Sequence, residues 1–197
     1  MDGLSTNLAA CRLLGCSYQP PTHIQSFFIS PSNGLKIYII LDACHMIKLV
    51  RNLLGDYKIL SYDNKLIKWE FIEKLYNYQS KCNIKLSNKL TKKHIYYKDN
   101  IMKVKLAVQV LSNSVAKSLE LLTNFNDFYD VQPTVDFLII INNIFDILNS
   151  RRLYDRNYKS ALNLGNLDNI INYLNYAKSY LLSLKDIQGK SLYCSKR

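Results

Sequence analysis

The sequence predicts a mainly α-helical protein in which a short α/β segment, residues 1–60, precedes a helical unit, residues 61–190. Hydrophobic residues make up 48% of the 197 residues, which is enough to form a core. Only six Gly and four Pro interrupt the chain, so long helices are favoured over collagen-like or low-complexity structure. Beyond residue 60, apolar side chains recur at the three- and four-residue spacing of amphipathic helices.

The N-terminal part is predicted to begin with a helix over residues 3–14, capped by Ser5. Residues 18–34 hold three of the four prolines and an Asn33-Gly34 turn signal, so a loop is expected there. The β-branched run at residues 36–41 predicts a strand that is buried on both faces of a sheet.

A helix is expected at residues 43–54, ending at Gly55. The strand that precedes it needs partner strands on both edges, and this sequence encodes none. We therefore expect the sequence to be a piece, or a shortened copy, of a larger protein. The helical unit is predicted to contain four amphipathic helices, the third of which starts with Pro133, where proline is tolerated. They cover residues 65–80, 102–122, 133–148 and 167–184.

The composition also restricts location and partners. No apolar run is long enough to span a bilayer, and the N-terminus resembles neither a secretory signal nor a transit peptide. Five scattered cysteines argue against a secreted disulfide scaffold, so an intracellular environment is expected. The formal net charge is +11, and residues 81–105 hold eight lysines against Asp99 alone. Such a run attracts the phosphates of a nucleic acid or a nucleotide, or forms a solvated basic face.

Two aspartates lie where a strand would give way to a helix. Asp2 and Asp42 would meet at one sheet edge and could share a divalent metal, as two-metal phosphoryl transfer requires. Alternatively, Asp42 caps the following helix, with His45 beside it. The spacing of the cysteines matches none of the usual zinc patterns. A phosphate-binding loop with the P-loop spacing of Gly and Lys is absent from the sequence.

Five segments, taken in order, resemble the P element transposase family, which includes the THAP-type transposases of animals. The first begins Asp-Gly-Leu-Ser-Thr-Asn, and the resemblance extends over essentially the whole chain. The segments are Asp2–Asn7, Leu41–Asn52, Asn88–Thr91, Met102–Ala107 and Phe145–Arg151.

The resemblance implies an RNase H-like core with three catalytic acids, split by a helical insertion domain that binds GTP. Residues 1–60 would be part of that core, residues 61–190 the insertion domain, and residues 191–197 the start of the return to the core. Asp2 would be the second catalytic acid and a ligand of Mg²⁺. The other two acids are not in this sequence, so we expect no strand-transfer activity from the chain alone.

The resemblance also implies a GTP site. Its residues would be Lys89, Lys103, Val104, Phe145, Asp146 and Asn149. The two lysines would neutralise phosphates, Val104 and Phe145 would pack on the base, and Asp146 would accept hydrogen bonds from the two guanine donors. Two alternatives stay open, because Phe145 also fits the apolar stripe of its helix and Asp146 could form a surface ion pair with Arg151 or Arg152.

The expected function is therefore that of a part of a P element-like DNA transposase whose insertion domain binds GTP. The expected partners are GTP and, in the full-length protein, transposon DNA in the nucleus and a second copy of the chain, with no membrane. The competing function is a non-enzymatic basic helical module that binds nucleic acid or a protein partner without nucleotide. A decayed copy that folds poorly is the third possibility.

Overall fold

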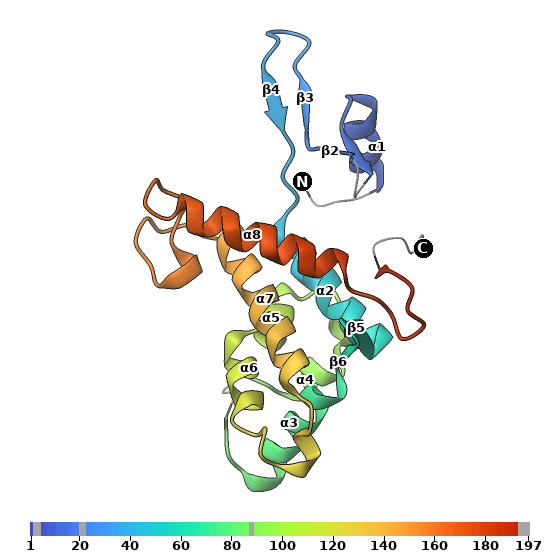
Figure 1. Cartoon of the computed structure of the whole chain (residues 1–197), viewed down its shortest axis with the longest axis vertical. Helices are drawn as coiled ribbons and strands as arrows, with labels where there is room; N and C mark the ends of the chain where they lie inside the picture. Colours follow the sequence, from blue (N-terminus) through green and yellow to red (C-terminus); the bar gives the residue numbers. More distant parts are fainter. Residues whose placement is uncertain (2–4, 20–22, 87–88, 193–197) are drawn as a thin grey trace. The chain divides into compact units, whose positions relative to one another are not determined.

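The computed structural model describes residues 1, 5–19, 23–86 and 89–192 (Figure 1). It divides into two compact units, Met1–Met46 and Ile47–Arg197. Asp2 and residues 193–197, on which parts of the predictions fall, lie outside the described residues. The mainly α-helical class is confirmed. The second unit begins earlier in the chain than the predicted helical domain at residue 61.

The first unit contains a helix and two small antiparallel strand pairs. Helix α1 (Ser5–Leu13) ends before Gly15, which has a φ of 100°. Strand β1 (Ser17–Gln19) pairs with β2 (His23–Gln25), and β3 (Phe27–Ile29) pairs with β4 (Lys36–Tyr38), placing Phe27 opposite Tyr38. The predicted loop over residues 18–34 is therefore wrong, because that segment supplies the partner strands.

The predicted buried strand at residues 36–41 is also wrong. Strand β4 is only three residues long, and all three are exposed, because it forms a two-stranded hairpin in place of the interior of a sheet. The turn signal itself was informative. Gly34 has a φ of 68°, and the side chain of Asn33 accepts a hydrogen bond from the backbone N–H of Leu35 (3.1 Å).

Helix α2 (Ala43–Tyr57) starts with the cap that the sequence allowed. The Asp42 carboxylate accepts hydrogen bonds from the backbone N–H groups of Cys44 (3.1 Å) and His45 (3.0 Å). The predicted end at Gly55 is wrong, because the helix continues for another half turn. Gly55 is buried inside it, and a side chain at this position would meet the ring of Tyr97.

A hairpin that the sequence analysis missed follows α2. Strands β5 (Ile59–Tyr62) and β6 (Lys65–Lys68) pair in an antiparallel register around Asp63-Asn64, which have φ values of 48° and 60°. These are the positive φ values of a tight hairpin turn. The predicted helix over residues 65–80 therefore begins only at α3 (Glu70–Cys82), after the hairpin.

Eight further helical segments complete the second unit. They are α4 (Lys92–Ile95), η1 (Tyr97–Asn100), α5 (Val104–Val110), α6 (Asn113–Glu120), η2 (Asn126–Phe128), α7 (Gln132–Leu148), η3 (Asn157–Lys159) and α8 (Leu167–Leu182). The predictions for α7 and α8 are confirmed. The single predicted helix over residues 102–122 is wrong, because Ser112 adopts an extended backbone and caps α6 by accepting a hydrogen bond from Val115 N–H (3.4 Å). None of the described helices is long and apolar enough to span a membrane.

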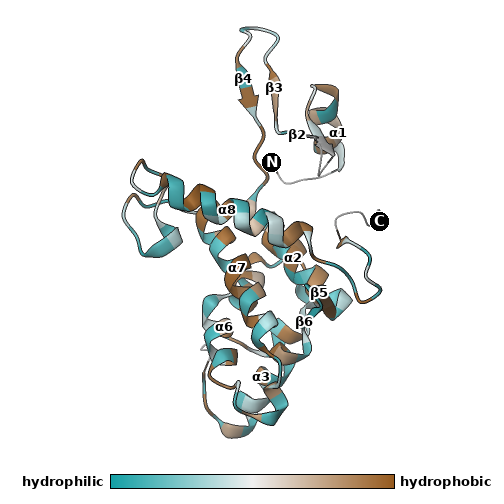
Figure 2. Ribbon diagram, in the orientation of Figure 1, coloured by the Kyte–Doolittle hydropathy of each residue, from teal (hydrophilic) through white to brown (hydrophobic). Residues whose placement is uncertain are grey.

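The core of the second unit forms around α7, whose apolar side packs against α6 and β6. Figure 2 shows hydrophobic stretches along this helix that are interrupted by hydrophilic positions. Val135, Leu138 and Trp69 are fully buried. The buried hydroxyl of Thr134 accepts a hydrogen bond from the backbone N–H of Lys68 (2.9 Å), which fixes the hairpin to the start of α7. Figure 1 shows α8 lying across the C-terminal half of α7.

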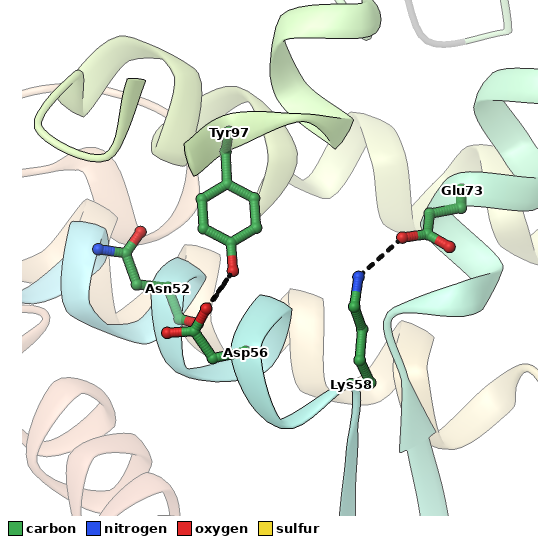
Figure 3. Close-up of polar contacts among 5 residues, drawn as sticks. All are labelled: Asn52, Asp56, Lys58, Glu73 and Tyr97. Atoms are coloured by element: carbon green, nitrogen blue, oxygen red, sulfur yellow. Dashed lines mark hydrogen bonds and ion pairs between the residues drawn. The ribbon is translucent and has the colours of Figure 1, made fainter. Parts of the chain in front are cut away.

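Tyr97 joins η1 to α2 (Figure 3). Its hydroxyl donates a hydrogen bond to the Asp56 carboxylate (2.8 Å), and the buried guanidinium of Arg51 lies 4.6 Å from its ring centroid. Arg51 also donates a hydrogen bond to the carbonyl of Ile101 (2.9 Å). These contacts hold the segment that leads into α5. Nearby, Lys58 pairs with Glu73 at 2.9 Å.

Candidate functional site

Charged side chains gather in a cavity between α6, the C-terminal half of α7 and η3. This cavity, here called the basic cavity, has a volume of about 620 Å³. Four cations face two acids in its lining, together with hydroxyl and amide side chains. The charged residues are Lys89, Lys117, Arg156, Lys159, Asp146 and Asp155. A cavity of this size and charge suits a small anionic ligand, since ligand sites range over about 300–1,000 Å³.

A second cavity, of about 490 Å³, adjoins the basic cavity at the end of α7. The two cavities share Asp146, Asp155 and Lys159 in their linings. The α7-end cavity also contains Asn149, together with Ser150, Arg151 and Arg152. Asp146 therefore lies at the boundary between two concave surfaces.

The Asp146 carboxyl is half-buried. It accepts a hydrogen bond from the side-chain amide of Asn142 one helical turn earlier (2.9 Å). Burial raises the pKa of this carboxyl above its ordinary value, while the nearby Lys159 and the Asn142 hydrogen bond act in the opposite direction. Among the described residues it forms no ion pair with Arg151 or Arg152. The carboxylate is thus left with acceptor capacity toward the cavities.

Lys89 reaches the basic cavity through the segment that precedes α4. Leu90 is buried beside it, and Thr91 caps α4 through reciprocal hydrogen bonds with His94. The other ring nitrogen of His94, Nε2, lies 2.9 Å from Oε1 of Gln109, a residue that also lines the basic cavity. A buried histidine therefore ties the Lys89 segment to α5.

The predicted GTP residues fall into two groups. Lys89 and Asp146 line the same cavity, and Asn149 lines the adjoining one. Lys103, Val104 and Phe145 belong to neither of these described linings. Lys103 is exposed directly before α5, whereas Val104 and Phe145 are half-buried and pack against the core.

Sequence reasoning missed part of the basic cavity. Lys117 lies on the polar side of α6, and Arg156 and Lys159 come from the irregular segment around η3. The four-residue spacing of Asn142 and Asp146 on one helix was the one local signal available. The others depend on how η3 packs against α7.

The described residues contain no group of three His, Cys, Asp or Glu side chains that could hold a metal ion. Asp42 serves as a helix cap, and Asp2 lies outside the described residues. Cys11, Cys16, Cys44 and Cys82 are free thiols.

Residues 44–161 match the family model for the TNP-like, GTP-binding insertion domain, and the chain belongs to this family. Over 181 residues it is 28% identical to the human DNA transposase THAP9, a match that covers 90% of this chain and 19% of that protein. It is 32% identical over 130 residues to the Transposable element P transposase of Drosophila melanogaster, a match that covers 64% of this chain and 17% of that protein.

Among solved structures, the chain is similar to the Drosophila P element transposase strand transfer complex. The TM-score is 0.77 with 28% sequence identity, and the match covers 90% of this chain and 40% of that chain. The predicted resemblance to P element transposases is thereby confirmed. The chain spans about a fifth of the length of the curated relatives it matches.

Proposed function

We propose that this chain binds GTP in the basic cavity and that it supports DNA transposition as part of a longer transposase. The observation that carries the proposal is that one cavity holds both Lys89 and Asp146 in a chain of the GTP-binding insertion domain family. The partners would be GTP, transposon DNA and a second copy of the chain, in the nucleus.

The proposed binding mode divides the cavity by charge. The triphosphate would lie toward Lys89 and the other cations, where its negative charge is compensated. Guanine would lie toward Asp146, because its N1–H and exocyclic amine present two parallel donors that one ionised carboxylate can accept. Adenine presents an acceptor at N1, so the same carboxylate would repel it. The preference for guanine would therefore depend on the ionised form of Asp146.

Asn149 would extend the site into the α7-end cavity. Lys103, Val104 and Phe145 remain proposed GTP contacts, and each would require movement of the cavity wall, since none lines it. Mg²⁺ would belong to the catalytic role proposed for Asp2. No step proposed for the described residues passes through that metal.

Isothermal titration calorimetry with GTP and ATP tests the proposal. We expect the folded chain to bind GTP at least about tenfold more tightly than ATP, a difference of about 1.4 kcal/mol. Asp146→Asn should abolish this preference, and Lys89→Ala should weaken the binding of both GTP and ATP. Asp136→Asn, which changes an exposed carboxylate on the same helix, is the matched control and should leave GTP affinity unchanged.

The outcomes that contradict the proposal are also defined. A cooperatively folded sample that binds no GTP, or binds ATP equally well, would overturn it. A salt-sensitive affinity for DNA that Asp146→Ala leaves unchanged, without nucleotide binding, would instead favour the basic helical module.

A further inference from the structure

A third cavity, of about 670 Å³, lies beside the basic cavity and differs from it in chemistry. Its described lining contains no charged residue. It consists of asparagines, two tyrosines and two isoleucines from α6, α7, η3, α8 and the position directly before α8. We call it the asparagine cavity. The six asparagines are Asn113, Asn143, Asn157, Asn166, Asn169 and Asn172. It contains none of the six predicted GTP residues.

Several of these amides are available to a ligand. Within the described part of the chain, the side chains of four asparagines have no hydrogen-bond partner: Asn113, Asn157, Asn169 and Asn172. Each amide can donate two hydrogen bonds and accept two. Four such groups around one cavity match a neutral ligand that has both donors and acceptors.

The two tyrosines supply an aromatic surface in the same cavity. The rings of Tyr158 and Tyr173 lie with centroids 4.4 Å apart and planes inclined by 35°. The hydroxyl of Tyr173 accepts a hydrogen bond from the side-chain amide of Asn143 (3.0 Å), which fixes this ring against α7. Nucleobases stack on such rings and offer hydrogen-bonding edges to nearby amides.

The asparagine cavity adjoins the basic cavity, because both are lined by Asn113, Asn143 and Asn157. A ligand that occupies this boundary would place a neutral, flat group among the amides and an anionic group toward Lys159 and Arg156. A nucleotide has this combination, whereas a neutral sugar lacks the anion. In a duplex, the Watson–Crick edges of the bases are paired and their faces are stacked, so a single base cannot enter a cavity.

We propose that the asparagine cavity binds one unpaired nucleobase of a single-stranded nucleic acid, next to the nucleotide in the basic cavity. This inference rests on the proposed function in one respect only: the nucleotide in the basic cavity is taken to be GTP. The α8 residues of the cavity lie beyond residue 161, where the match to the family model ends. They therefore add a binding surface to the one that the family assignment covers.

Fluorescence anisotropy with a labelled single-stranded oligothymidylate of about ten nucleotides tests this, since single-strand sites span roughly 4–16 nucleotides. The double substitution Asn169→Ala and Asn172→Ala changes two exposed positions of α8 to a good helix former. It should weaken binding of the single strand about tenfold, leave a duplex of the same length unaffected and leave GTP calorimetry unchanged. Asn175→Ala, exposed on α8 but outside the cavity, is the control.

Three outcomes would decide against the inference. Unchanged single-strand affinity in the double variant would overturn it, and so would equal weakening of duplex binding. Loss of GTP affinity in the double variant would assign the cavity to the base of GTP itself. Conversely, if the wild-type chain binds no GTP while the double variant still loses single-strand affinity, the proposed function fails and this inference stands.

Discussion

The hydroxyl of Tyr97 donates a hydrogen bond to the carboxylate of Asp56, which lies 41 positions earlier in the chain, at 2.8 Å. The same ring is in contact with Arg51 on one side and meets Trp69 edge-on at a centroid distance of 5.5 Å. Gly55 leaves room for it on the α2 surface. Tyr97 is therefore confined by α2 and by the start of α3.

This confinement predicts the effect of Gly55→Ala. Alanine is favoured over glycine in a helix by about 1 kcal/mol, but the added methyl group would collide with Tyr97, and such overpacking costs about 1–3 kcal/mol. We expect a net loss of stability and a lower Tm in circular dichroism. In a Tyr97→Leu background the same substitution should cost less, because the collision is removed. A higher Tm for Gly55→Ala alone would contradict this packing.

The burial of Arg51 predicts that substitutions at this position destabilise the fold. Its side chain is fully buried, and burial lowers the pKa of the guanidinium below its ordinary value, although Tyr97 and Asp56 oppose this shift. Arg51→Ala should cost roughly 2–5 kcal/mol in the free energy of unfolding, because it leaves a cavity and removes the hydrogen bond to the carbonyl of Ile101. Chemical denaturation measures this.

Arg51→Lys is the conservative comparison. It keeps the charge but loses the planar group that lies over Tyr97, so it should also destabilise, by less than the alanine variant. An alanine variant as stable as the wild type would show that Arg51 is not buried as described.

Buried tyrosines predict the alkaline limit of stability. Burial raises the pKa of Tyr97 and of Tyr180 above the ordinary tyrosine value of about 10. Because the folded pKa exceeds the unfolded one, this contribution to stability is complete below about pH 10 and is lost as the pH rises further. The free energy of unfolding should therefore fall above about pH 10, and the phenolate absorbance of these two residues should appear late in a titration. Replacing both with Phe should reduce this loss, and an unchanged pH dependence would contradict the assignment.

Asp146 predicts the acidic limit of GTP binding. Burial raises the pKa of its carboxyl, so the ionised form that guanine requires is lost at a higher pH than for an exposed aspartate, whose pKa is about 3.9. GTP affinity should weaken as the pH falls toward the raised pKa, while ATP affinity changes less. Calorimetry across that range measures the difference, and Asp146→Asn should remove it.

The same shift predicts that Asp146→Asn does not destabilise the fold at neutral pH. A carboxyl whose folded pKa is raised contributes stability below its unfolded pKa and loses it as the pH rises. The asparagine variant should therefore keep the wild-type Tm or exceed it, which separates a binding defect from a folding defect. A clear decrease in Tm would show that the Asn142 hydrogen bond dominates.

The long helices could be predicted because apolar residues recur at helical spacing over many residues. This pattern indicates both that a helix is present and which side of it is buried. Helix α7 also starts with Pro133 in its first turn, as expected. The break between α5 and α6 could not be found from this pattern. Both short helices bury apolar residues in the same core, so the helical spacing of apolar residues continues across Ser112. Gly55 could not be understood without Tyr97, whose position depends on tertiary packing.

The site was predictable in part for a similar reason. Lys89 and Asp146 were selected from segments that resemble a known family, and both line the basic cavity. Lys117 and Lys159 carry no such signal, since their proximity arises only when α6 and η3 pack around α7. The β5–β6 hairpin was missed although Asp63-Asn64 is a turn signal, because the neighbouring apolar residues also fit a helical period.

Trp69 is the chain's one tryptophan, and it is fully buried within the second unit. Its intrinsic fluorescence therefore reports on the unfolding of that unit without a label. Comparing tryptophan emission with far-ultraviolet circular dichroism along one denaturation curve would show whether the two units melt together or in succession.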